Sequence, residues 1–198
     1  MGKEKIQFDH EEPDSSLTST LSWFKSRFNQ AKFFGDSEVI PRDKVDFLLK
    51  EIKTFTNNNV LESKLLYKYD TRNTLNFHNF VDHKENMLIV IRLINNITVG
   101  GFSCYPLSKL DKEQAKKQGV GRGFLFNLTF DKSFQMRKDA KNLVMTYDEF
   151  FFLFGNSELR LRSQEKKFFS NFGVANSTFD NAGFPRSEFL GVHDPACN

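Results

Sequence analysis

The segment at residues 147–180 constrains the fold more than any other part of the chain. It opens on an aromatic run, FFFLF at 150–154, which Gly155-Asn156 interrupts. Residues 158–162, ELRLR, then alternate polar and apolar, which indicates a strand with one buried face. Two such runs joined by a glycine-containing turn predict a β-hairpin, and a third apolar run follows at Phe168-Phe169. The polar face of this hairpin, expected to meet solvent or a partner, comprises Glu158, Arg160 and Arg162.

The phenylalanine content predicts a thick aromatic core. The chain has 198 residues, enough for one well-buried domain, and 24 of them are Phe. Most of these rings must be buried, because each removes a large apolar area from water. The net charge is only +3, since 28 basic residues are balanced by 25 acidic ones. This balance predicts a mixed, solvated surface and no nucleic-acid partner.

The N-terminus and the cysteines predict a cytoplasmic protein. Residues 1–14 are polar, lack an apolar signal core, and are expected to be a tail without a fold of its own. The longest apolar runs are too short for a membrane span. Cys104 and Cys197 lie far apart and form no disulfide framework, which favours a reducing compartment.

Residues 15–60 are predicted to form a helical extension of two amphipathic helices. Apolar residues of the first recur at steps of four and three, at Leu17, Leu21, Phe24 and Phe28. The second begins at Pro41, ends at the asparagines 57–59, and carries the stripe Val45, Leu48, Leu49 and Ile52. Both stripes are expected to pack on the β-core of this chain, with docking of a partner by the first helix as the alternative.

Residues 61–198 are predicted to form a mainly antiparallel β-domain. Strands are expected at 64–70, 87–94, 97–105, 123–130, 134–137 and 142–146, with a short helix after Asn73 or Thr74 and a loop-like end after Asp180. The β-branched run at 87–94 predicts a central strand buried on both faces. Gly100-Gly101 marks a bulge or a close backbone approach in the next strand. Strands preceded by helices predict the α+β class, mainly β, with an antiparallel β-sandwich.

Short motifs in this region resemble the TLDc domain family in their order and spacing. The front half of that domain is matched by Leu65-Leu66-Tyr67-Lys68, by Phe77-His78 and by Val99-Gly100-Gly101-Phe102. Phe124-Leu125-Phe126-Asn127-Leu128 resembles the F-L-F-S-L strand, and Ser170-Asn171-Phe172-Gly173 resembles the S-N-F-G segment. The likeness covers residues 63–191 and implies a TLDc-like β-sandwich.

The chain departs from that family at two places. The glycine-rich segment G-P-T-F-G-G-G-H-D is replaced by residues 147–156, where only Phe154-Gly155 remains of it. A terminal strand resembling E-V-Y-x-L is not found before Asn198. The sheet is therefore expected to lack an edge strand, which a partner could supply by strand addition.

The sequence contains few groups of residues that could bind a metal or a phosphate or act as a nucleophile. His78 and Asp82 would share a helix face while His83 points elsewhere, which provides fewer ligands than a metal site needs. The glycines at 119–123 precede a strand and not a helix, so they do not fit a phosphate loop. Cys104 follows a buried-looking strand, which favours a core thiol over a nucleophile. We therefore predict no catalytic residue, no cofactor and no metal.

The resemblance implies a non-enzymatic interaction module or structural subunit of a large intracellular assembly. TLDc-like proteins are associated with oxidative-stress protection, and several bind the V-type ATPase. The expected partners are V-ATPase subunits, or tubulin and axonemal proteins of a cytoskeletal or ciliary lattice. The residues predicted to contact the partner are the first helical stripe (Leu17, Leu21, Phe24, Phe28), the basic loop (Lys112, Lys116, Lys117), which suits an acidic surface, and the C-terminal edge near Phe189. The competing hypothesis is an oxidative-stress factor or redox enzyme that uses Cys104.

Overall fold

The fold is described from a computed structural model. It describes residues 33–35, 37–60, 62–69, 77–104, 106, 123–138, 144–147, 150–155, 158–162, 168–170, 172, 178–180, 183–184 and 186–190. The helical elements are η1 (Arg42–Lys44), α2 (Val45–Thr56), α3 (Phe77–Val81) and α5 (Arg186–Leu190). The strands are β1 (Met87–Arg92), β2 (Thr98–Ser103), β3 (Gly123–Asn127), β4 (Lys132–Gln135), β5 (Val144–Tyr147), β6 (Phe150–Phe154), β7 (Leu159–Arg162) and β8 (Phe168–Phe169).

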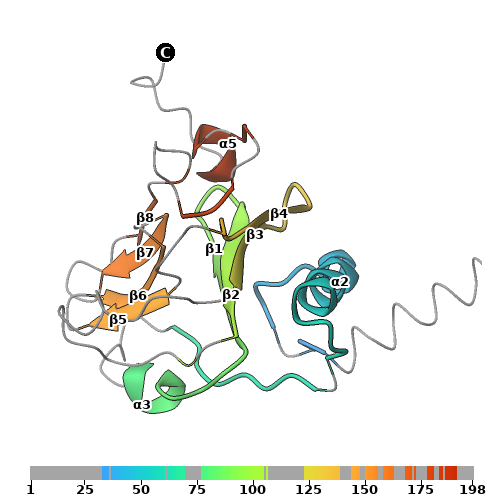
Figure 1. Ribbon diagram of the computed structural model, residues 1–198, viewed down its shortest axis with the longest axis vertical. Coiled ribbons are helices and arrows are strands. Elements are labelled where there is room, and N and C mark those ends of the chain that lie inside the picture. Colours follow the sequence, from blue (N-terminus) through green and yellow to red (C-terminus); the bar gives the residue numbers. More distant parts are fainter. Residues whose placement is uncertain are drawn as a thin grey trace, which may run out of the picture.

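These strands form two antiparallel sheets, in the orders β1-β2-β3-β4 and β5-β6-β7-β8. Figure 1 shows α2 on one side of the first sheet and the second sheet on its other side. α5 lies at one end of the first sheet and α3 at the opposite end (Figure 1). The prediction of a mainly β chain with antiparallel sheets is confirmed.

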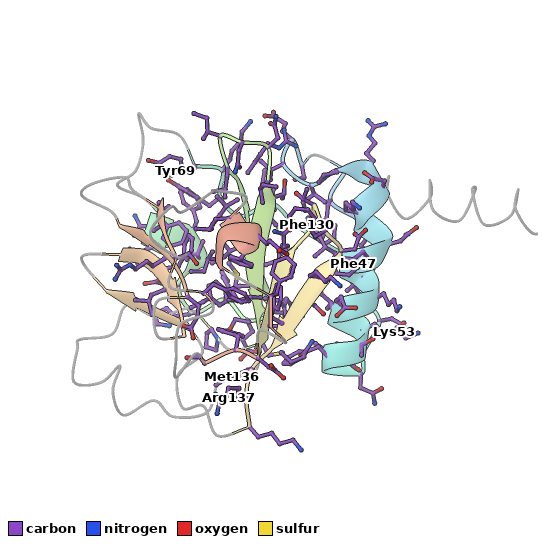
Figure 2. The ribbon with its side chains drawn as sticks, turned by 90° about the horizontal axis from the view of Figure 1, so that it is seen from above. Phe47, Lys53, Tyr69, Phe130, Met136 and Arg137 are labelled. Atoms are coloured by element: carbon purple, nitrogen blue, oxygen red, sulfur yellow. The ribbon has the colours of Figure 1, made fainter. Side chains whose placement is uncertain are left out.

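The first sheet is buried on both faces because its side chains alternate between two aromatic clusters. One face contributes Phe102, Phe124 and Phe126, which pack with Leu48 of α2. Figure 2 shows Phe47 of α2 on this side as well. The other face contributes Val99, Leu125 and Phe134, and these join a cluster with Phe152, Phe154 and Leu159 of the second sheet.

The two glycines of β2 allow rings to pack closely on both of its faces. The pairing of β1 with β2 runs without interruption through Ile89↔Gly101 and Val90↔Gly100, so there is no bulge here. A Cβ on Gly101 would lie 2.6 Å from the ring of Phe154, and one on Gly100 would lie 2.5 Å from the ring of Phe126. A Cβ on Gly100 would also collide with the backbone carbonyl oxygen of Ile89, so of the two predicted explanations for the glycine pair the close backbone approach is confirmed.

The prediction that residues 87–94 form a central, doubly buried strand is wrong. Among the described strands, β1 lies at the edge of its sheet, and its only strand neighbour is β2. Its middle residues are half-buried, whereas β2 is buried along its whole length. Within the described part of this sheet, the interior positions belong to β2 and β3, and both are buried along their whole length. An apolar run in the sequence does not reveal which strands pair on both sides, because strand order is set by segments distant in the chain.

The second predicted helix is confirmed, and it packs on the chain's own sheet. Val45, Leu48 and Ile52 are buried, and Asn57 ends α2 in the left-handed conformation with φ 58°. Lys44 Nζ donates to Asp131 Oδ2 over 2.7 Å, and Ser133 Oγ donates to Glu51 Oε2 over 2.5 Å. These two bonds fasten the helical segment to the hairpin of β3 and β4. The first predicted helix lies outside the described residues.

The hairpin within residues 147–180 is confirmed as β6 and β7, with β8 as the third apolar run. Gly155 follows β6 with φ 59°, a conformation that favours glycine. The predicted solvent face is wrong at Glu158, which is buried with 1% of its surface exposed. Glu158 lies in the turn before β7, where its carboxylate Oε1 accepts a hydrogen bond from the backbone N–H of Thr178.

Two further expectations fail at the ends of the predicted β-domain. Residues 64–69 form no strand, and Leu65 and Tyr69 are exposed there. The region after Asp180 contains a helix, α5, where the sequence suggested only loop. α5 has 5 residues, which is too short for helical periodicity to show in the sequence. Its position depends on contacts with distant residues, described below.

Candidate protein-docking surface

The residues predicted to contact a partner lie mostly outside the described part of the chain. This holds for Leu17, Leu21, Phe24 and Phe28, and equally for Lys112, Lys116 and Lys117. Phe189 is described, and its side chain is fully buried. Phe189 is thus a core residue in this structure and does not form the exposed edge contact that we expected.

Exposed apolar side chains mark two other surfaces, one at each end of the first sheet. Among the described residues, the large exposed ones are Leu65 (61%), Tyr69 (39%), Phe80 (50%), Ile94 (104%) and Phe130 (45%). We call Leu65, Tyr67, Tyr69 and Phe80 the α3 patch, and Ile94 with Phe130 the hairpin tips. Large exposed apolar side chains that gather in one place are typical of surfaces that bind another molecule.

The α3 patch combines an extended segment with a short helix. Figure 1 shows residues 62–69 running from α2 towards α3. Tyr67 is half-buried, and its ring meets Phe77 edge-on at 5.2 Å and Phe80 at 6.3 Å between centroids. Tyr67 therefore anchors the exposed ring of Phe80 to the core. Leu65 and Tyr69 flank Tyr67 in sequence, and Figure 2 shows Tyr69 at the margin of the molecule.

Two polar contacts hold the elements of the α3 patch in place. His78 Nδ1 of α3 lies 3.0 Å from Oδ1 of Asp82, which directly follows the helix. Lys68 Nζ lies 2.7 Å from Glu38 Oε2 and thereby joins the extended segment to the chain before α2. The hydrogen bond from Lys68, aided by its charge, lowers the pKa of the Glu38 carboxyl below its usual value. Both Glu38 and Lys68 are exposed, so salt weakens this ion pair.

The predicted shared face of His78 and Asp82 is confirmed by this contact. The two residues provide fewer protein ligands than a metal site takes. No group of three His, Cys, Asp or Glu side chains that could hold a metal ion occurs within the described residues. We assign the pair a structural role, because it links the second residue of the 5-residue helix α3 to the residue that directly follows the helix.

The hairpin tips lie together at the other end of the first sheet. The register pairs Val99 with Asn127, so the turn between β1 and β2 and the turn between β3 and β4 point the same way. Ile94 occupies the first turn, which the Asn96 N–H closes by donating to the Leu93 carbonyl over 3.0 Å. Phe130 occupies the second turn, and Figure 2 shows it beside α5. Hydrogen bonds within each turn fix the backbone at both tips, including one from the Phe130 N–H to Asn127 Oδ1.

Cys104 lies directly after β2 and is half-buried. It packs against the cluster of Phe102 and Phe124 on the α2 side of the sheet. The prediction that its thiol contacts core residues agrees with this packing.

The exposed aromatic residues were not singled out from the sequence as a docking surface. Tyr67 and Phe77 are part of the motifs that resemble the TLDc family. The sequence around an aromatic residue does not show whether its ring is buried or exposed. A usable signal existed for Ile94 only. Ile94 is the last residue of the predicted strand 87–94 and directly precedes Asn95-Asn96, a turn-forming pair, so the sequence places it at a strand end near the surface.

No helix within the described ranges is both long enough and apolar enough to cross a bilayer. Searches against models of protein families, against curated proteins and against solved structures found no significant match to this chain.

Proposed function

We propose that this chain is a TLDc-like β-sandwich that acts as a non-enzymatic interaction module or structural subunit in a larger intracellular assembly. The sandwich is supported by the shared aromatic cluster, in which Leu125 of the first sheet packs with Phe152 and Phe154 of the second. The short distance between Gly101 and the Phe154 ring supports face-to-face contact of the sheets. Two antiparallel sheets around one core are the arrangement that the motif resemblance implies.

The observation that carries the docking function is the α3 patch. Aromatic side chains are enriched at the centres of protein interfaces, where a few of them provide most of the binding energy. Phe80 and Tyr69 are exposed, and the ring of Phe80 is held against the half-buried Tyr67. Tyr69 lies on the segment that Lys68 joins to Glu38. A patch held in this way loses little conformational entropy on binding, which favours a protein partner.

The assembly we propose is a cytoskeletal or ciliary lattice, with the V-type ATPase as the second candidate. The lattice would offer acidic tubulin tails to the basic loop of Lys112, Lys116 and Lys117, and the α3 patch would supply the apolar contact. The V-type ATPase follows from the family resemblance alone. Both assemblies place the protein in the cytoplasm.

Direct binding assays distinguish the two assemblies. The purified chain is sedimented with stabilised microtubules, and separately is titrated into the purified soluble sector of the proton pump. We expect binding to one of them and a loss of at least tenfold in affinity, about 1.4 kcal/mol, for Phe80→Ser and for Tyr69→Ser. Ile94→Ser is the matched control, because it removes an exposed apolar side chain at the opposite end of the sheet.

The outcomes separate the parts of the proposal. If neither assembly binds the chain, both partner assignments are wrong. If binding occurs but Phe80→Ser and Tyr69→Ser bind as the unchanged chain does, the α3 patch is not the docking surface. Equal losses for all three variants would indicate general destabilisation, which thermal unfolding of each variant would reveal.

The competing redox function depends on Cys104, which is half-buried beside the aromatic cluster of α2. Thiol labelling of the folded chain tests it. Our proposal predicts slow labelling at Cys104 and a Cys104→Ser variant that folds and binds normally. Rapid labelling, together with loss of a peroxide-scavenging activity in Cys104→Ser, would establish the redox function instead.

A further inference from the structure

The ladder of the first sheet shows which main-chain groups of β1 point out of the sheet. The Leu93 N–H donates to the Ile97 carbonyl over 2.8 Å, and these two residues continue the register of β1 with β2. Hydrogen-bonded and non-hydrogen-bonded pairs alternate along antiparallel strands, so every second residue back from Leu93 bonds to β2. The N–H and carbonyl groups of the residues between them, Leu88, Val90 and Arg92, therefore point away from β2. We call these groups the β1 edge.

The bonds of the neighbouring strand agree with this assignment. Thr98 lies opposite Arg92, and its carbonyl accepts from the Leu128 N–H over 2.8 Å, on the β3 side. Within the described part of the chain, no hydrogen bond is found from the main-chain groups of the β1 edge. The extended residues 62–69 form no strand pair with β1. The β1 edge can therefore accept a further strand.

Nothing in β1 blocks such pairing. The strand has 6 residues, MLIVIR, with no proline and with its only charge at the end, and its register with β2 is uninterrupted. Proteins commonly protect edge strands with inward charges, prolines or bulges. Leu88 and Val90 pack against the cluster of α2, whereas Ile89 and Ile91 pack against the cluster shared with the second sheet. A strand added here would have apolar neighbours on both faces and must itself be apolar on both, as β1 is.

The other edge of this sheet is different. Beside β4, the Gln135 carbonyl accepts from the Asp180 N–H, and the Arg137 N–H donates to the Thr178 carbonyl, both over 2.9 Å. The chain itself thus occupies part of the β4 edge. Pairing through β1 would therefore join two molecules and stop there, because a two-fold contact uses the same surface of both.

We propose that β1 pairs with β1 of a second copy of this chain, antiparallel and about a two-fold axis at Val90. Leu88 and Arg92 lie symmetrically about Val90, so each outward N–H of one copy meets an outward carbonyl of the other. Ile89 falls opposite Ile91, a favourable cross-strand pair of β-branched side chains. Arg92 falls opposite Leu88, so like charges do not face each other across the axis.

The two-fold axis is perpendicular to the sheet, so both copies of α2 lie on one face of the joined sheet and both second sheets on the other (Figure 1). The residues of the α3 patch are not part of this pairing. The proposed contact is therefore separate from the docking surface described above, and either can fail without the other.

The mass of the full chain in solution is the first test. Sedimentation velocity and light scattering across micromolar concentrations should give a species of twice 23.1 kDa. A mass that stays at 23.1 kDa at every concentration would overturn the proposal and leave the β1 edge to a strand of another protein.

Val90→Pro tests whether main-chain hydrogen bonds join the two copies. It removes an outward N–H, and proline is compatible with an edge strand where its nitrogen faces away from the sheet. We expect the dissociation constant of the dimer to rise at least about tenfold while β2 keeps its hydrogen-exchange protection. Val90→Ile is the matched control, because it keeps the N–H and the β-branched side chain, and should dimerise like the unchanged chain. Unchanged dimerisation of Val90→Pro would show that β1 does not form the contact.

A disulfide at the axis tests the register in a variant that keeps every main-chain group, and it decides the matter if Val90→Pro does not fold. In a chain carrying Cys104→Ser and Cys197→Ser, Val90→Cys should form an intermolecular disulfide under mild oxidation. Directly opposite residues of a hydrogen-bonded pair lie about 5.5 Å apart between Cα atoms, within the range of a disulfide. Ile94→Cys is the matched control, since this position is fully exposed but lies away from the axis. No disulfide at Val90→Cys, or equally fast formation at Ile94→Cys, would overturn the proposed pairing.

Discussion

Gly101 of β2 lies directly beneath the ring of Phe154 of β6, so that a Cβ on Gly101 would stand 2.6 Å from two of its ring atoms. No methyl group fits at that distance unless the ring or the backbone moves. The contact joins the two sheets through one residue of each. It also explains why a glycine occupies the middle of a fully buried strand, where any side chain would hold the sheets apart.

The first prediction concerns this contact. Gly101→Ala should lower the free energy of unfolding by about 1–3 kcal/mol, because the new methyl group overpacks the space beneath the ring. Urea denaturation measures the change. In a Phe154→Leu background, which removes the ring edge, the same substitution should be less costly. Additive losses in this double-mutant cycle would show that Gly101 and Phe154 do not constrain each other.

The second prediction concerns the packing of α2 on the first sheet. Leu48 is fully buried there, whereas the adjacent Leu49 is half-buried. Leu48→Ala should destabilise the protein by about 2–5 kcal/mol, since it opens a cavity against Phe124 and Phe126. Leu49→Ala, the matched control, should have a clearly smaller effect in the same thermal or urea unfolding experiment. Equal effects would place both side chains at the same depth and contradict the packing of α2.

The third prediction concerns the buried carboxylate of Glu158. Its Oε1 accepts the Thr178 N–H, and Thr178 is itself buried. Glu158→Ala should destabilise the protein by about 1–3 kcal/mol, because a buried donor would lose its acceptor. Glu158→Gln keeps an acceptor oxygen at the same place and should retain more of the stability. A Gln variant as unstable as the Ala variant would show that the Thr178 bond contributes little.

The fourth prediction concerns pH. Lys68 holds the pKa of Glu38 below its ordinary value of 4.5 in the folded protein. A depressed carboxyl pKa contributes stability above pH 4.5, and this contribution disappears as the pH falls through the folded pKa. Lys68→Gln should return the pKa of Glu38 to its ordinary range, as an NMR titration of the carboxyl carbon would show. The stability difference between the two proteins should be small, should vanish in acid, and should shrink in high salt because the pair is exposed. A difference that persists below the folded pKa would mean that Lys68 acts through its aliphatic packing.

Local patterns in the sequence were sufficient for several elements. The aromatic run before the Gly155 break predicted β6, and the alternation after it predicted β7, because a period of two reports a strand independently of its neighbours. The stripe of Val45, Leu48 and Ile52 predicted α2 for the same reason, with a period of 3.6. These patterns are local consequences of backbone geometry, so a single chain is enough to detect them.

Other features depended on neighbours that the pattern does not contain. The apolar run of β1 was predicted to be central, yet β2 and β3 hold the interior positions among the described strands of this sheet. Glu158 was predicted to face solvent, yet it is buried, and its carboxylate accepts a hydrogen bond from the backbone N–H of the distant Thr178. Similarly, the α3 patch was missed because whether Tyr69 and Phe80 are exposed depends on what packs over them.

The sequence by itself determined that this chain folds into antiparallel strands around an aromatic core with an amphipathic helix on its surface, because strand and helix periods are properties of the local backbone. Only the tertiary structure decided which phenylalanines are buried, that β1 is an edge strand of its sheet, and that α5 packs onto the end of the core. Burial is a relation between segments far apart in the chain, and for Phe189 it comes from Phe172, Phe134 and the amide of Asn127.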